Sequence, residues 1–273
     1  MSTVTSRDGT TIAFEQVGSG PPLILVDGAL GYRELYGSRP IAEALSGAFT
    51  AIAYDRRGRG ESSDTSPFGL EREIEDIEAL IDAAGGSAYL FGASSGAALA
   101  FEAALALGEG RVRGLAMYEP PYNDEPAARQ AWRNYRRELR ETLAAGRPGD
   151  AVGLFMVLLG MPPEQLAGMQ QDPFWPQFQA LGHTLEYDAA ALGEEAALPS
   201  ERAARLAVPT LVIDGGATEW SFLHTTAVAL AQAIPHAEHR TLEGQTHEVE
   251  PEALLPVLRE FFLREATAGG ARR

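Results

Sequence analysis

The sequence predicts an α/β fold in which a mostly parallel sheet is covered by helices on both faces. Short apolar runs alternate with stretches of helical spacing along most of the chain. A Gly-x-Ser-x-Gly pattern at residues 92–96 lies between one apolar run and an Ala-rich helical stretch. With 273 residues, of which 45% are hydrophobic and 22% charged, the chain can bury the core of one large domain with an insertion.

Seven strands are expected where short apolar runs are bounded by turn residues. They are residues 10–17, 23–26, 50–54, 88–91, 112–118, 209–213 and 238–242. Apolar residues at helical spacing predict the helices between and after them. These helices are residues 34–45, 70–83, 97–107, 222–233 and 251–263. The small, polar residues 266–273 are expected to be frayed.

The pattern of strands and helices that the sequence predicts changes after Glu119-Pro120-Pro121. From there to about Pro199, helical stretches are broken by Gly and Pro, and no buried strand is evident. We therefore expect residues 121–199 to form an inserted helical lid. Residues 1–120 and 200–273 would then form the core.

Composition limits the classes of partner. Asp and Glu number 38 against 22 Lys and Arg, and the resulting net charge of -16 argues against binding nucleic acid or an anionic membrane. The chain has no cysteine, so disulfides and thiolate metal sites are excluded. The first twenty residues lack an apolar signal core, and no run approaches the ~18 apolar residues of a membrane span. A cytoplasmic protein with a small-molecule substrate is expected, either as a monomer or as a homodimer.

Ser94 is the candidate nucleophile. A serine hydroxyl attacks efficiently only when the backbone holds it clear of its neighbours, beside a base and facing amide donors. Gly92 and Gly96 would let a strand and a helix approach closely enough for a sharp turn with Ser94 at its apex. The alternative reading is an ordinary turn between a strand and a helix of a parallel sheet.

Five motifs occur in the order of the landmarks of the α/β-hydrolase fold, and the chain resembles that superfamily. They are residues 23–30, 54–62, 91–96, 208–215 and 243–248. The resemblance covers nearly the whole chain except the lid. It implies a sheet of about eight strands and a serine hydrolase that needs no cofactor.

The resemblance points to His247 as the general base, because that residue follows the last predicted strand and precedes the last predicted helix. A serine hydrolase of this fold also needs an acid that orients the histidine. Here the chain departs from the commonest pattern, since Thr218 stands where such hydrolases usually carry an aspartate. Some members place the acid after the preceding core strand, where this chain has Glu119. Glu119 is therefore the first choice, and Asp214 and Glu219 are the alternatives.

By the same resemblance, the backbone amides of Ser95 and Ala29 would form the oxyanion hole. Asp27 occupies the place of a histidine common in the family. It is either a hydrogen-bond acceptor within its loop or a ligand of the substrate, where it would oppose anions.

The predicted lid is rich in aromatic residues, and we expect some of them to bind substrate. The candidates are Trp132, Tyr135, Phe155 and Trp175. The His-Glu-x-x-His zinc signature is absent, and the serine at residue 94 argues against chemistry that needs an aspartate nucleophile.

The sequence thus predicts a hydrolase acting on an ester, thioester or lactone of an apolar or aromatic small molecule. Two alternatives stay open. One is a non-hydrolytic biosynthetic enzyme on the same fold, such as a cyclase, lyase or acyltransferase. The other is a ligand-binding protein on this scaffold, which a serine-directed probe would leave unlabelled.

Overall fold

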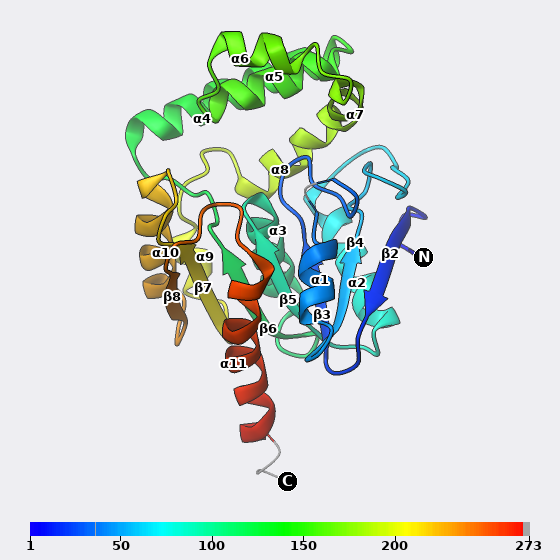
Figure 1. Cartoon of the computed structure of the whole chain (residues 1–273), viewed down its shortest axis with the longest axis vertical. Coiled ribbons are helices and arrows are strands. Elements are labelled where there is room, and N and C mark those ends of the chain that lie inside the picture. Colours follow the sequence, from blue (N-terminus) through cyan, green and yellow to red (C-terminus); the bar gives the residue numbers. More distant parts are fainter. Residues whose placement is uncertain (36, 270–273) are drawn as a thin grey trace.

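An eight-stranded sheet forms the centre of the computed structural model, which describes residues 1–35 and 37–269 (Figure 1). The strands follow the spatial order β1-β2-β4-β3-β5-β6-β7-β8. They are β1 (Ser2–Thr5), β2 (Thr11–Val17), β3 (Pro22–Val26), β4 (Thr50–Tyr54), β5 (Ala88–Ala93), β6 (Val112–Tyr118), β7 (Thr210–Gly215) and β8 (Glu238–Leu242). β1 and β2 pair antiparallel, and β2 pairs antiparallel with β4. The remaining neighbours are parallel, so their carboxyl ends meet at one edge.

Helices cover both faces of this sheet because the central strands are apolar on both sides. In β3, Leu23 and Leu25 pack with α1 (Arg39–Leu45) and α11 (Pro251–Gly269). Ile24 and Val26 face the opposite way. There they join the core formed with α2 (Leu70–Ala83), α3 (Ser95–Leu107) and α10 (Ser221–Ala233).

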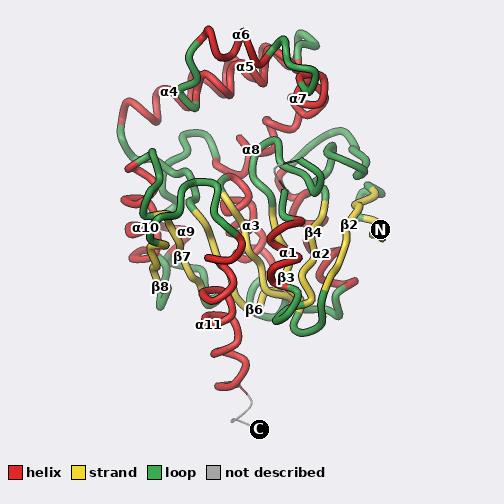
Figure 2. Tube along the Cα trace, in the orientation of Figure 1, coloured by secondary structure: helices red, strands yellow, loops and turns green. Residues whose placement is uncertain are grey.

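The chain between β6 and β7 is helical throughout its regular structure, as the colouring in Figure 2 shows. Its helices are α4 (Pro126–Ala144), α5 (Pro148–Leu158), α6 (Pro163–Met169), α7 (Trp175–Leu181), the 3₁₀ turn η1 (Gly182–Thr184), α8 (Leu185–Leu192) and α9 (Ser200–Ala203). Helices α4 to α7 form a layer above the carboxyl ends of the strands (Figure 1). Helix α8 packs against α3, which connects this layer to the core.

The predicted fold class is confirmed, whereas several element boundaries differ. β1 is missing from the prediction because it has a single apolar residue, Val4, among three exposed polar residues, so it shows no apolar alternation. The sequence predicts a helix from residue 34, but α1 begins at Arg39, since Tyr32 and Leu35 pair with each other through their backbones.

The carboxyl terminus also differs from the prediction. Helix α11 continues to Gly269 through part of the segment expected to be frayed, and residues 270–273 of that segment lie outside the described residues. Across residues 1–35 and 37–269, none of the helices combines the length and apolarity that crossing a bilayer requires.

Candidate active site

Ser94 lies at a strained turn between β5 and α3. Its φ of 55° and ψ of -129° are unfavourable for a residue with a side chain. The turn is tight on both sides: a Cβ atom on Gly92 would lie 2.4 Å from the carbonyl oxygen of Gly96, and one on Gly96 would lie 2.3 Å from that of Val26. The two glycines therefore allow the close approach that presents the Ser94 side chain at the carboxyl edge of the sheet.

His247 and Glu119 meet at the same edge. Nδ1 of His247 lies 2.6 Å from Oε2 of Glu119, although the two residues are 128 positions apart in the chain. Glu119 directly follows β6, has a positive φ of 46° and is fully buried. A buried carboxylate at Nδ1 fixes the ring so that Nε2 is available as a proton acceptor.

The Glu119 carboxylate is held by further donors. The amide of Gly215 donates to its Oε1 at 2.9 Å, and the Thr218 hydroxyl lies 3.4 Å from its Oε2. Thr218 is the residue that occupies the usual place of the acid, so here that position supports a carboxylate from the neighbouring strand. The Tyr118 hydroxyl donates to the carbonyl of Thr246 and so holds the loop that carries His247.

The two alternative acids lie elsewhere. Asp214 is buried at the end of β7 and pairs with His224 and His239 instead of His247. Glu219 is exposed. Of the three acids considered from the sequence, Glu119 is the one that contacts the candidate base.

Ser95 and Ala29, the two predicted oxyanion donors, both line the cavity that contains Ser94 and His247. Ser95 is the first residue of α3, so its amide has no acceptor one turn earlier in the helix and lies at the positive end of the helix dipole. This arrangement can stabilise negative charge that develops on a carbonyl oxygen next to Ser94.

Asp27 does not line this cavity, which favours the first of its two expected roles, a hydrogen-bond acceptor within its loop, over that of a substrate ligand. Its side chain is buried, and its Oδ2 accepts a hydrogen bond from the Ser38 hydroxyl at 3.3 Å. Burial raises the pKa of Asp27 to about 7, although Ser38 and the charges of Arg59 and Arg56 oppose the rise. The side chain therefore belongs to the interior of its loop.

The cavity has a volume of about 280 Å³ and a mainly apolar wall. Of the four aromatic residues expected to bind substrate, Trp132, Tyr135 and Phe155 line the cavity, and Trp175 does not. Trp175 is buried at the start of α7 in the apolar cluster that holds the inserted helices together. The remaining wall is formed by Pro121, Asn123, Ala128, Ala131, Leu158, Leu159, Leu185, Asp188, Ala189, Leu192, Glu195, Ala196, Trp220, Phe222 and Leu223.

Asp188 on α8 is a cavity residue that the sequence analysis misses. Its carboxylate lies 2.5 Å from Arg56 and 2.6 Å from Arg59, and it accepts a hydrogen bond from the Ser95 hydroxyl at 2.9 Å. Burial alone would raise the pKa of Asp188, but the two guanidinium groups hold it below its ordinary value.

The same two arginines hold the loop that contains Ala29. Arg56 donates to the carbonyl of Asp27 at 3.1 Å, and Arg59 donates to that of Gly28 at 2.6 Å. They therefore connect the inserted helices to both predicted oxyanion donors. In the sequence, this network is indicated only by the two arginines after β4, which need an anionic partner if they are buried. No sequence pattern identifies Asp188 as that partner, because it lies more than a hundred residues away.

Trp220 is a second residue that the sequence analysis misses. Its ring lies edge to face against His247, with the ring centroids 5.3 Å apart, and it also lines the cavity.

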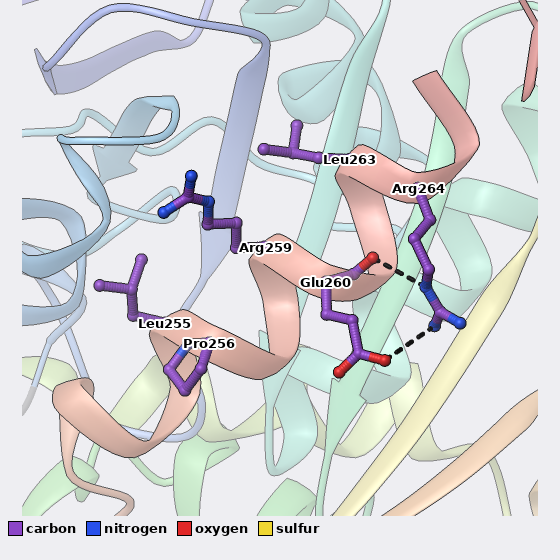
Figure 3. Close-up of a pocket in the computed structure, with 6 residues that line it drawn as sticks. All are labelled: Leu255, Pro256, Arg259, Glu260, Leu263 and Arg264. Atoms are coloured by element: carbon purple, nitrogen blue, oxygen red, sulfur yellow. Dashed lines mark hydrogen bonds and ion pairs between the residues drawn. The ribbon is translucent and has the colours of Figure 1, made fainter. Parts of the chain in front are cut away.

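Figure 3 shows a different hollow, along the outer surface of α11, where Arg264 bonds to Glu260. Ser94 and His247 do not line that surface hollow, so it has no part in the chemistry described above.

Comparisons with known proteins agree with this fold. Residues 23–257 match the profile of the alpha/beta hydrolase family. The structure of an alpha/beta hydrolase from Sphaerobacter thermophilus DSM 20745 is 50% identical, with a TM-score of 0.82 over 96% of this chain and 100% of that chain. A thermophilic esterase from Thermogutta terrifontis, solved with malate bound, is 25% identical, with a TM-score of 0.71 over 97% and 98% of the two chains. The non-heme chloroperoxidase CPO-A1 of Kitasatospora aureofaciens is 22% identical over 276 residues, which cover 97% of this chain and 98% of that protein.

Proposed function

Because the chain belongs to the alpha/beta hydrolase family, we propose that it hydrolyses esters, thioesters or lactones of apolar or aromatic small molecules through Ser94, His247 and Glu119. The observation that carries this proposal is the 2.6 Å contact between His247 and Glu119 at the cavity into which the strained Ser94 turn opens. The 50% identical relative is itself described as an alpha/beta hydrolase, in agreement with this class of enzyme.

In the proposed acylation step, the Ser94 oxygen attacks the carbonyl carbon while Nε2 of His247 takes the hydroxyl proton. Glu119 stabilises the imidazolium that forms, and the amides of Ser95 and Ala29 bind the oxyanion. Collapse of this intermediate breaks the bond to the leaving group, which receives the proton from His247. Water then attacks the acyl-enzyme by the same route, which releases the acid and restores Ser94.

The cavity wall supports the proposed substrate class. Its aromatic and aliphatic side chains suit an apolar acyl or alcohol group, and its volume of about 280 Å³ suits a small molecule better than a polymer. Trp132, Tyr135 and Phe155 come from α4 and α5 of the inserted segment. In this proposal, residues 121–199 therefore act as a lid that sets specificity.

A serine-directed fluorophosphonate probe tests the proposal. We expect one equivalent of label per chain, lost in Ser94→Ala and kept in Ser200→Ala, which changes an exposed serine at the start of α9. Both variants should keep the wild-type circular dichroism spectrum. A folded wild-type protein that takes up no label, or label that persists in Ser94→Ala, would overturn the proposed nucleophile.

A further inference from the structure

A second cluster of chemically active side chains lies outside the cavity, at the carboxyl end of β7. Asp214 brings its Oδ2 within 2.8 Å of Nδ1 of His224 and its Oδ1 within 2.6 Å of Nε2 of His239. One possible ligand atom from each of the three residues lies within 4.8 Å of the others. We propose that these residues form a binding site for a divalent transition-metal ion, with Zn²⁺ as the best fit.

Three packed elements place these ligands. Asp214 lies on β7, His239 lies on the adjacent parallel strand β8, and His224 lies in α10, which packs against both strands. Thr241 pairs in register with Asp214, and its hydroxyl donates to the same carboxylate at 3.1 Å. His239 and Thr241 are two residues apart on one strand, so both side chains point to the same face of the sheet. The backbone therefore holds the cluster in place before any ion binds.

The charge at this cluster favours a cation. Asp214 is fully buried, and its partners are two imidazoles and the Thr241 hydroxyl. A divalent ion bound between the three side chains would place positive charge directly beside this buried carboxylate. The His224 side chain is 54% exposed and that of His239 is 26% exposed, which gives an ion a route from solvent.

The donor set selects the class of metal. Two imidazole nitrogens and one carboxylate oxygen suit Zn²⁺ and its neighbours in the first transition series, whereas Mg²⁺ and Ca²⁺ prefer oxygen ligands. Bonds of about 2.0–2.2 Å place tetrahedral ligand atoms roughly 3.4 Å apart. The contacts of 2.8 and 2.6 Å between Asp214 and the two imidazoles must therefore lengthen by well under 1 Å. All three ligand atoms already lie within 4.8 Å of one another. Each imidazole that donates to Asp214 would move its proton to its other ring nitrogen, and water would complete the coordination.

Occupation of this site would join the edge strand β8 and helix α10 to β7. Asp214 immediately precedes Gly215, whose amide donates to Glu119, but none of the three ligands lines the Ser94 cavity. We therefore assign the site a structural role. This inference does not depend on the proposed hydrolytic activity.

The test uses untagged, chelator-treated full-length protein and isothermal titration with Zn²⁺, with Mg²⁺ as the comparison ion. We expect one Zn²⁺ per chain, an increase in Tm of a few degrees at saturation and no response to Mg²⁺. Co²⁺ bound at the same site should give the visible absorption of a tetrahedral ion. His224→Ala and His239→Ala should each weaken Zn²⁺ binding by more than the roughly 10- to 100-fold that loss of an outer hydrogen-bond partner costs.

Two controls separate this site from other histidines. His236→Asn changes an exposed histidine with a positive φ of 60° between α10 and β8, and Asn tolerates that conformation. His247→Ala removes the imidazole of the cavity. Both variants should bind Zn²⁺ like the wild type. Absence of Zn²⁺ binding by the wild type, or binding that survives both His224→Ala and His239→Ala, would overturn the assignment.

Discussion

Glu119 and His247 form a 2.6 Å contact between Oε2 and Nδ1, although the acid follows β6 and the histidine follows β8. Strand β7 lies between β6 and β8 in the sheet, and its Gly215 amide donates to the same carboxylate. The acid is thus fixed by a backbone donor, and a positive φ at Glu119 directs the chain away from the strand. Ser94 also has a positive φ, so both ends of the proposed triad lie on strained backbone.

The first prediction concerns the charge of this acid. Glu119→Gln keeps the size of the side chain but removes the negative charge that stabilises the imidazolium. We expect the acylation rate to fall about 10³- to 10⁴-fold, as other triads lose when this charge is removed. Single-turnover acylation with an activated ester measures the loss.

Glu219→Gln is the matched control, because it makes the same chemical change at an exposed glutamate one residue after Thr218. Its acylation rate should stay near that of the wild type. A larger loss in Glu219→Gln than in Glu119→Gln would mean that the acid had been assigned to the wrong residue.

The sequence predicts those parts of the site that depend on local pattern. The turn at Ser94 has two glycines and flanking elements of clear type, and His247 follows a recognisable strand. Glu119 could be proposed from the resemblance to the α/β-hydrolase superfamily, because Thr218 departs from the usual pattern and some members carry the acid after the preceding strand, where Glu119 stands. A short stretch of chain contains most of the information for Ser94, whereas His247 and Glu119 also needed the order of landmarks in the resembled fold.

Contacts between distant segments could not be predicted in the same way. The pairing of Asp188 with Arg56 and Arg59 joins α8 to a loop after β4, and no local pattern specifies it. The sequence also could not separate Trp132, which lines the cavity, from Trp175, which packs among the inserted helices. Both are large apolar residues at helical positions, and their surroundings depend on how the helices pack.

The second prediction concerns the Asp188 network. Asp188→Asn leaves Arg56 and Arg59 buried with less compensating charge, so the free energy of unfolding should fall by about 3–5 kcal/mol. Urea unfolding at pH 7 measures the change. Asp150→Asn removes an exposed partner of Arg147 and should cost no more than about 1 kcal/mol. Equal losses of unfolding free energy in the two variants would show that the buried ion pairs of Asp188 stabilise the fold no more than an exposed ion pair does.

The third prediction concerns Asp27 and pH. Because burial raises the pKa of Asp27 to about 7, the folded protein holds this proton at a pH where the unfolded chain has released it. Its contribution to stability is therefore complete below the unfolded pKa of about 3.9 and is lost as pH rises to about 7. Asp27→Asn removes this contribution to the pH dependence.

Urea unfolding of the wild type and of Asp27→Asn across pH 4–8 checks the third prediction. Relative to the variant, the wild type should lose on the order of a few kcal/mol of unfolding free energy over that range. Asp82→Asn, which changes an exposed aspartate paired with Arg111, should follow the wild type at every pH. A constant difference between the wild type and Asp27→Asn would show that Asp27 is ionised in the folded protein throughout the range.

The last prediction concerns the charge of the substrate. Glu195 lines the cavity and pairs with Arg129 and Arg133, so those guanidinium groups are already neutralised near the cavity wall. With a net charge of -16, the protein should also repel anions at long range. We therefore expect a neutral aromatic ester to have a higher kcat/KM than an anionic ester of similar shape. The ratio of the two kcat/KM values should decrease at high salt.

Glu195→Gln should release Arg129 and Arg133 from their ion pairs and raise kcat/KM for the anionic ester while leaving that for the neutral ester nearly unchanged. Glu194→Gln is the matched control. It changes an adjacent glutamate that is 74% exposed, pairs with Arg136 and Arg140, and does not line the cavity. Both substitutions change the net charge equally, so a long-range effect would alter them alike, whereas an effect of the cavity wall would appear only in Glu195→Gln. A wild-type preference for the anionic ester at low salt would contradict this account and indicate that the arginines of α4 reach the bound substrate.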